Sequence, residues 1–212
     1  MKRLICIIIL FLLEGCSSIK LTKDWKNPEI DLYEPTKVFI VGLTSHEEAR
    51  FQFEKQLQKA LKQRSLEAVI SMNFLDADFK TTKQSEEQLN SVEQKLIKNG
   101  FDTIIFSKII RTEDRVKYKK THYNDAKTTQ NFKEDYISSQ QFFFNTDYYD
   151  AYKIYHLETT VYCICPTKER EILWKGYIEV VDPKSIDKTV NRYVKLVVNK
   201  LETQNLISSL TK

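Results

Sequence analysis

The sequence is poor in glycine, with only Gly15, Gly42, Gly100 and Gly176 among its 212 residues. These four positions lie far apart, so the chain has no glycine-rich loop of the kind that cradles phosphate groups. It also lacks the G-x-S-x-G turn that exposes the nucleophilic serine of many hydrolases. The scarcity of glycine therefore excludes two common ways of building a catalytic or nucleotide-binding site.

Other catalytic motifs are missing as well. The segment His46–Arg50 begins like a zinc-binding H-E-x-x-H helix but ends in arginine where the second histidine would stand. The segments Ser17–Lys20 and Ser185–Lys188 match the serine–lysine spacing of β-lactamases, yet the companion S-D-N and K-T-G elements are absent. We therefore expect no enzymatic activity, no cofactor and no metal. An enzyme whose site is assembled from distant residues is the alternative.

An excess of one charge is also lacking, because 33 Lys and Arg residues stand against 29 Asp and Glu residues. Nucleic-acid-binding proteins gather basic side chains on one surface. We therefore expect no nucleic acid among the partners. The content of 42% hydrophobic and 12% aromatic residues is sufficient for a folded core.

The sequence has one long apolar run, the ten residues Leu4–Leu13, which follow the basic pair Lys2 and Arg3. A helix needs about 20 apolar residues to cross a hydrocarbon core of about 30 Å, so this run is too short to span a membrane. Its length is typical of the hydrophobic region of an export signal.

The segment Leu13-Glu14-Gly15-Cys16 resembles the lipobox of bacterial lipoproteins. The resemblance implies that residues 1–15 are a signal peptide and that Cys16 carries the lipid. No aspartate follows Cys16, so the predicted location is the outer membrane, facing the periplasm. Cleavage there would leave 31 basic and 28 acidic side chains. The alternative is an ordinary cleaved signal with a chance cysteine.

Two further cysteines, Cys163 and Cys165, belong to the expected mature chain. In a continuous strand, residues two apart are separated by about 6.5 Å. A disulfide between them would be strained, and an isolated C-x-C pair is a poor metal site. We therefore expect both cysteines to be free thiols.

The hydrophobic pattern predicts one α/β domain over residues 36–212, preceded by a tether over residues 16–35. Strands are expected at 37–43, 67–71 and 101–118, with helices between them from Ser45 and from Ser85. This β-α-β-α-β order favours parallel pairing. An antiparallel hairpin (151–165 with 172–181) and a C-terminal amphipathic helix should complete a mixed sheet with an α+β tendency.

Several local predictions follow the same reasoning. Capping boxes are expected at Ser45–Glu48 and Ser85–Gln88, a left-handed helix end at Gly100, and a helix start at Asp182-Pro183. The last helix should bury a stripe that includes Val194.

Three residues, Trp174, Gly176 and Glu54, could be structural or functional. We expect Trp174 to fill the core and Gly176 to relieve crowding or to mark a bulge. Glu54 is expected on the solvated flank of its helix, with a buried functional carboxylate as the alternative.

Residues 119–150 form a long polar segment that is unusually rich in aromatic residues. Long loops without structure of their own are often functional. The candidate partner-binding residues are Phe142, Phe143, Phe144, Tyr148 and Tyr149. The alternatives are a surface excursion packed on the sheet edge and a membrane-inserting hairpin.

Four segments carry a family resemblance: Lys37–Leu43, Arg50-x-x-Phe53-Glu54, Gly100–Ile105 and Leu173–Gly176. Together they resemble small envelope lipoproteins whose domain is similar to the amino-terminal domain of TolB and the periplasmic domain of CsgG. The resemblance implies a non-catalytic component of envelope assembly. Its partners would be the membrane, through the N-terminal lipid, and an envelope protein. A subunit of an oligomeric secretion or export assembly related to CsgG is the alternative, although the transmembrane hairpins of CsgG are not visible in this sequence.

Overall fold

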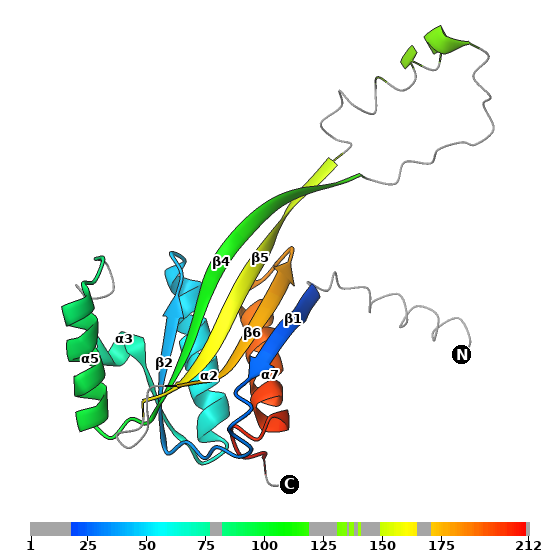
Figure 1. Cartoon of the computed structure of the whole chain (residues 1–212). Coiled ribbons are helices and arrows are strands. Elements are labelled where there is room, and N and C mark those ends of the chain that lie inside the picture. Colours follow the sequence, from blue (N-terminus) through cyan, green and yellow to red (C-terminus); the bar gives the residue numbers. More distant parts are fainter. Residues whose placement is uncertain are drawn as a thin grey trace, which may run out of the picture.

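A computed structural model describes residues 18–76, 82–118, 131–134, 136–137, 140, 149–164 and 171–210. The fold is mixed α/β, as predicted (Figure 1). In chain order its elements are β1 (Ser18–Lys26), β2 (Lys37–Leu43), α2 (Glu47–Lys62), β3 (Glu67–Ile70), α3 (Ser71–Phe74), α5 (Glu86–Lys98), β4 (Thr103–Tyr118), β5 (Tyr149–Cys163), β6 (Ile172–Val181) and α7 (Ile186–Thr203). In this part of the chain no helix is long and apolar enough to cross a membrane.

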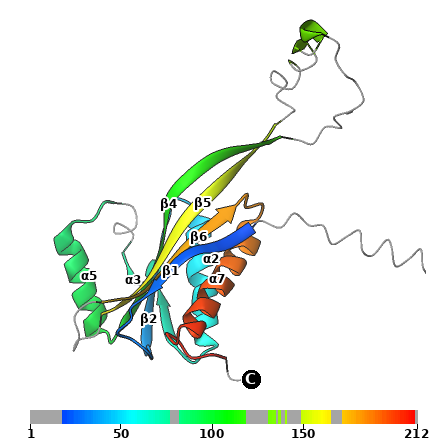
Figure 2. The ribbon, with the colours of Figure 1, turned by 45° about the vertical axis from the view of Figure 1, so that its right-hand side comes forward.

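One six-stranded sheet, in the order β1-β6-β5-β4-β2-β3, forms the centre of the molecule. Strand β2 pairs parallel with β3 and β4, whereas β4, β5, β6 and β1 pair antiparallel. Helices α2 and α7 cover one face, and α3 and α5 pack on the other face beside β2 (Figures 1 and 2). The larger core lies between the sheet and the pair α2 and α7.

Helix α7 buries the predicted stripe, which consists of Val190, Tyr193, Val194, Val197, Val198 and Leu201. Burial of each large apolar side chain contributes roughly 1.5–3 kcal/mol before entropy is counted. The capping box at Ser85 and Gln88 and the positive φ of Gly100 are also confirmed. The pattern of apolar residues therefore predicts this part of the fold correctly.

Two predicted helix starts are wrong. The N-cap of α2 is His46, whose Nδ1 accepts from the backbone N–H of Ala49 at 3.3 Å, so Ser45 forms no capping box. The N-cap of α7 is Ser185. Asp182 has φ +50° and its N–H donates to the Lys153 carbonyl, so the chain is still turning away from β6 at that residue.

The predicted tether is wrong in its first half, because Ser18–Lys26 forms β1 and pairs antiparallel with β6. The register shifts between Leu21 and Lys23, which adds one residue to β1. Ile19 and Leu21 face the larger core before this shift, whereas Asp24 faces Trp174 after it. The apolar–polar alternation that signals a strand is therefore interrupted in the sequence.

Trp174 lies in the core, as predicted, with none of its surface exposed. Its indole N–H donates to the Asp24 carboxylate at 3.3 Å. A Cβ at Gly176 would stand 2.2 Å from the Trp174 ring, so the absence of a side chain at Gly176 makes room for the indole.

The prediction of a free thiol at Cys163 is wrong, because Cys163 is disulfide-bonded. Its partner lies outside the described residues, as does Cys165. Strand β5 ends at Cys163, so the spacing of a continuous strand does not apply beyond that residue.

Candidate functional site: a hairpin arm and a cavity at one end of the sheet

Strands β4 and β5 pair with each other over their full length, as far as Tyr118 and Tyr149. Their neighbours stop earlier, since β2 pairs with β4 only as far as Lys108 and β6 pairs with β5 only from Ile154. Among the described residues, the outer part of this hairpin therefore has no third strand. We call Asp114–Tyr118 together with Tyr149–Lys153 the hairpin arm; it projects beyond the body of the domain (Figures 1 and 2).

Ion pairs hold the base of the hairpin arm. The Glu113 carboxylate contacts the guanidinium groups of Arg111 and Arg115, and it lies 3.1 Å from Nε2 of His156. The hydrogen bond from Arg115, aided by the charge of Arg111, holds the pKa of Glu113 below its ordinary value. Farther out, Lys153 on β5 contacts Asp114 on β4 at 2.8 Å. Of these contacts, only those of Glu113 with His156 and of Asp114 with Lys153 join β4 to β5, and water screens exposed pairs of this kind, so they orient the two strands without fixing them firmly.

Apolar side chains are exposed on and beside the hairpin arm. Val116 is 60% exposed, and Ile110 at the base is 47% exposed. A two-stranded ribbon without a covering layer is marginally stable in water. Its free edges can also pair with another strand. The hairpin arm therefore has the properties of a surface that another molecule covers.

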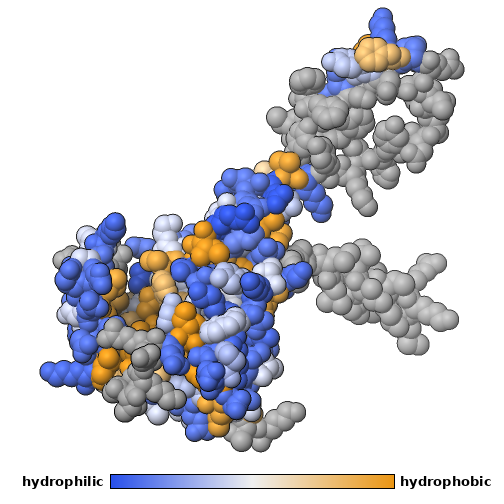
Figure 3. All heavy atoms as spheres, viewed as in Figure 1, coloured by the Kyte–Doolittle hydropathy of each residue, from blue (hydrophilic) through white to orange (hydrophobic). Residues whose placement is uncertain are grey.

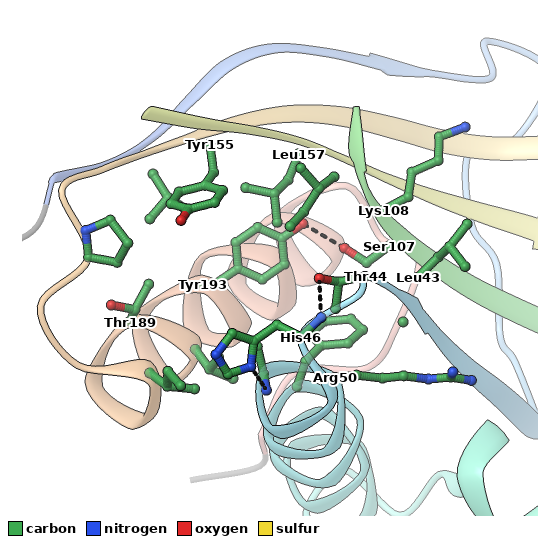
Figure 4. Close-up of a pocket in the computed structure, with 18 of the residues that line it drawn as sticks. Leu43, Thr44, His46, Arg50, Ser107, Lys108, Tyr155, Leu157, Thr189 and Tyr193 are labelled. Carbon is green, nitrogen blue, oxygen red and sulfur yellow. Dashed lines mark hydrogen bonds between the residues drawn. The ribbon is translucent and has the colours of Figure 1, made fainter. Parts of the chain in front are cut away.

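A cavity of about 330 Å³ lies at the same end of the sheet, between the first turns of α2 and α7 (Figure 4). Its walls are mainly apolar and include Leu43, Phe53, Ile109, Leu157, Val180 and Ile186. The carboxyl end of β2 borders it, which is where α/β sheets commonly bind ligands. Its volume is at the lower end of the range of ligand pockets, about 300–1,000 Å³.

Two hydroxyl groups of the cavity wall, those of Ser107 and Tyr193, meet the hydroxyl of the buried Thr159. Ser107 Oγ lies 2.8 Å from Thr159 Oγ1 and 2.7 Å from Tyr193 Oη, and the threonine and tyrosine oxygens are 2.5 Å apart. Burial raises the pKa of Tyr193 to about 12, so the phenol keeps its proton at neutral pH. Since the side-chain hydrogen bonds of these groups run among themselves, the arrangement favours a closed structural network rather than an activated nucleophile.

The charged groups at the rim of the cavity have partners of opposite charge. Lys108 Nζ lies 3.1 Å from the Glu158 carboxylate, and Lys184 Nζ lies 2.7 Å from Asp182. Burial raises the pKa of Glu158, but the hydrogen bond and charge of Lys108 outweigh it, and the pKa is lowered overall. The cavity therefore offers a mainly apolar interior behind a charge-balanced rim, which suits an apolar ligand better than an ionic one.

Glu54, which was expected on a solvated helix flank, is fully buried, so that prediction is wrong. One of its oxygens accepts from Gly42 N–H at 3.0 Å, from Ser71 Oγ at 2.6 Å and from Arg50 Nε at 3.2 Å. The other accepts from Met72 N–H at 3.1 Å. Glu54 thus ties α2 to the ends of β2 and β3 beside the cavity. Arg50, which lies one helical turn before Glu54, is the feature of the local sequence that could have indicated a buried ion pair.

The predicted site residues fall almost entirely outside the described part of the chain. Cys16, Phe142, Phe143, Phe144 and Tyr148 are in this group. Tyr149 opens β5 opposite Tyr118, but its side chain is not among those described. Within the described ranges, no group of three or more His, Cys, Asp or Glu side chains could hold a metal ion.

Neither a family model nor a curated protein matches this sequence. Among solved structures, the chain is similar to the PelC dodecamer from Paraburkholderia phytofirmans, with 8% identity, a TM-score of 0.42, and coverage of 92% of this chain and 100% of that one. It is also similar to lipoprotein GNA1162 from Neisseria meningitidis, with 11% identity, a TM-score of 0.41, and coverage of 80% and 99%. Likenesses of this level do not assign a function, and the resemblance to TolB and CsgG stays a prediction.

Proposed function

We propose that this protein is a non-catalytic envelope lipoprotein, anchored by a lipid on Cys16 in the outer membrane, which binds another envelope component in the periplasm. The observation that carries the proposal is the hairpin arm. The export signal and the lipobox resemblance at residues 1–16 support the location.

The size of the hairpin arm supports a binding role. Five residue pairs, from Asp114 with Lys153 to Tyr118 with Tyr149, continue beyond the last residue of β6. At about 3.4 Å per residue they extend the sheet by about 17 Å. A two-stranded ribbon is only marginally stable on its own. Burying the exposed Val116 and one free strand edge against a partner would therefore stabilise it.

The aromatic residues of the adjoining segment extend the same proposal. Phe142, Phe143, Phe144, Tyr148 and Tyr149 lie in or next to the connection between the two strands of the hairpin arm. Aromatic side chains are enriched at the centres of protein interfaces, because they bury a large area with few rotatable bonds. We therefore assign partner contact to the hairpin arm and this connection together.

A non-catalytic role is supported by the chemistry at the cavity. The hydroxyls of Ser107, Thr159 and Tyr193 bond to one another, and within the described ranges the side-chain hydrogen bonds of the cluster reach no imidazole or carboxylate. A serine without a neighbouring base is a weak nucleophile at neutral pH.

Affinity capture of the acylated protein from envelopes, with identification of what co-purifies, tests the proposal. One variant replaces residues 115–152 by Asn-Gly, which leaves Asp114 and Lys153 as the closing pair. A second variant replaces only residues 121–147 by a short turn and keeps both described strands. We expect the first variant to lose about tenfold or more of the captured partner while its thermal melt stays cooperative.

The second variant separates the two parts of the proposed surface. Loss of capture in both variants assigns the contact to the aromatic connection, and loss in the first alone assigns it to the strands. Undiminished capture in both would contradict the proposed role. Recovery of further copies of this chain in place of another protein would favour the oligomeric assembly.

A further inference from the structure

The proposed lipid attachment site is very close to the folded sheet. Ser18 already pairs with Val181 in the β1–β6 ladder, so only Ser17 separates Cys16 from β1. Whatever their conformation, two residues span at most about 7 Å. The lipid would therefore begin at the edge of the domain, at the end of the sheet where β6 passes to α7.

The cavity borders that same end of the sheet. Val180, which pairs with Ile19 of β1, lines it together with Pro183, Lys184 and Ser185 from the turn after β6. Ile19 itself packs against the larger core beside this row. The beginning of β1 thus lies next to β6, and β6 itself forms part of the wall of the cavity (Figure 4).

The interior of the cavity fits a hydrocarbon chain. Leu43, Ile109, Leu157, Val180 and Ile186 present aliphatic groups to it. If a methylene group takes about 30 Å³, close to the volume of a water molecule in the liquid, the cavity of about 330 Å³ holds roughly ten of them. Ile109 and Leu43 are 38% and 57% exposed, so apolar side chains lie at the entrance that connects the interior with the surface. Figure 3 shows one face of the molecule, on which apolar side chains lie among mainly hydrophilic ones.

We propose that this cavity holds one acyl chain of the lipid on Cys16, so that the end of the domain is docked on its own anchor. The inference rests on the proposed lipid anchor. A chain linked through two residues has an effective concentration in the millimolar range or above, which favours it over a free amphiphile for the same cavity. One docked chain would hold the end of the sheet with the hairpin arm at a fixed orientation to the bilayer.

Photocrosslinking from the lipid tests this inference on the full chain in native envelopes. Cells are fed a fatty acid that carries a diazirine near its terminal carbon, the envelopes are irradiated, and mass spectrometry maps the crosslinked peptides. We expect crosslinks in the cavity-lining peptides around Ile109, Leu157 and Val190. Ile109→Glu places a carboxylate at the entrance and should lower their yield by about tenfold.

The matched control is Ile110→Glu. Ile110 is the next residue, is 47% exposed and does not line the cavity, so the same change there should leave the crosslinks unaltered. Thermal melts of both variants check that the domain is folded.

Each other outcome has a separate meaning. An acylated Cys16 whose label reacts only outside the cavity, or crosslinks that persist in Ile109→Glu, would overturn the inference. Cavity crosslinks that persist in Cys16→Ser would show that the acyl chain in the cavity comes from a bilayer lipid, and they would overturn the inference that it comes from the lipid on Cys16. An unmodified Cys16 in the wild-type protein would instead refute the proposed anchor.

Discussion

Replacement of Glu54 by alanine should destabilise the domain strongly. The carboxylate is fully buried and accepts hydrogen bonds from two backbone N–H groups, those of Gly42 and Met72, and from the side chains of Arg50 and Ser71. Alanine would leave these donors without their acceptor and would open a small cavity beneath α2. The perturbation therefore acts on the junction of α2, β2 and α3.

The expected magnitude follows from the burial of this ion pair. Removing one partner of a buried ion pair typically costs about 3–5 kcal/mol. Each orphaned buried donor costs about 1–3 kcal/mol, but these amounts do not add fully because the site relaxes. We expect a loss of about 4 kcal/mol, which is a large part of the roughly 5–15 kcal/mol that stabilises an ordinary domain.

Urea unfolding followed by circular dichroism measures this loss directly. The matched control is Glu48→Ala, since Glu48 is exposed in the first turn of the same helix and its carboxylate accepts a hydrogen bond from the exposed Gln52 side chain; it should cost less than about 1 kcal/mol. A double-mutant cycle with Arg50→Ala should give a coupling of about 1–3 kcal/mol. A cost for Glu54→Ala as small as that of the control would refute the argument.

Four further predictions concern the core and the pH dependence. Val194→Asp puts a carboxylate at a position that is 4% exposed and should lower the free energy of unfolding by about 3 kcal/mol or more; a melt equal to wild type would disprove burial of that face. Gly176→Ala brings a methyl group to 2.2 Å from the Trp174 ring and should cost about 1–3 kcal/mol in the same urea assay. The pKa of Tyr193 is raised to about 12, so its contribution to stability is complete below pH 10 and is lost as the pH rises toward 12; Tyr193→Phe should flatten that part of the stability curve. The pKa of Glu158 is lowered, so its contribution is present above pH 4.5 and is lost on further acidification; Glu158→Gln should reduce the acid slope, and an unchanged slope would argue against the pairing with Lys108.

The parts of the fold that the sequence predicts are those where burial is periodic. In α7, Val190, Val194, Val197 and Leu201 recur at helical spacing and are buried. The same holds for Phe53, Leu57 and Leu61 in α2. Such spacing is visible in the sequence because each residue's exposure depends mainly on its place in its own helix.

The errors arise where one residue changes the local geometry. The extra residue near Thr22 moves Asp24 to the core side of β1 and hides the strand pattern. Thr44 Oγ1 accepts from His46 N–H at 3.2 Å, which shifts the start of α2 by one residue from the expected cap. Both features depend on the conformation or the hydrogen bond of a single residue, and the spacing of apolar residues in the sequence does not indicate them.

The candidate site was beyond sequence reasoning for a different reason. Three of the four donors to Glu54 belong to Gly42, Ser71 and Met72, which lie 12 to 18 residues away along the chain, and only Arg50 is near in sequence. The cavity likewise needs the first turns of α2 and α7 together with β4 and β5. Most of the buried surface of the cavity comes from ordinary apolar residues, so the sequence alone does not distinguish these residues from the rest of the core.

The intact mass of the protein purified from envelopes tests the central claim most directly. The proposed anchor predicts a chain that starts at Cys16 and carries the mass of a diacylglycerol group, with or without an amide-linked acyl chain. A chain that retains Met1 would contradict both the anchor and the proposed envelope role, and one that starts at an unmodified Cys16 would contradict the lipid anchor.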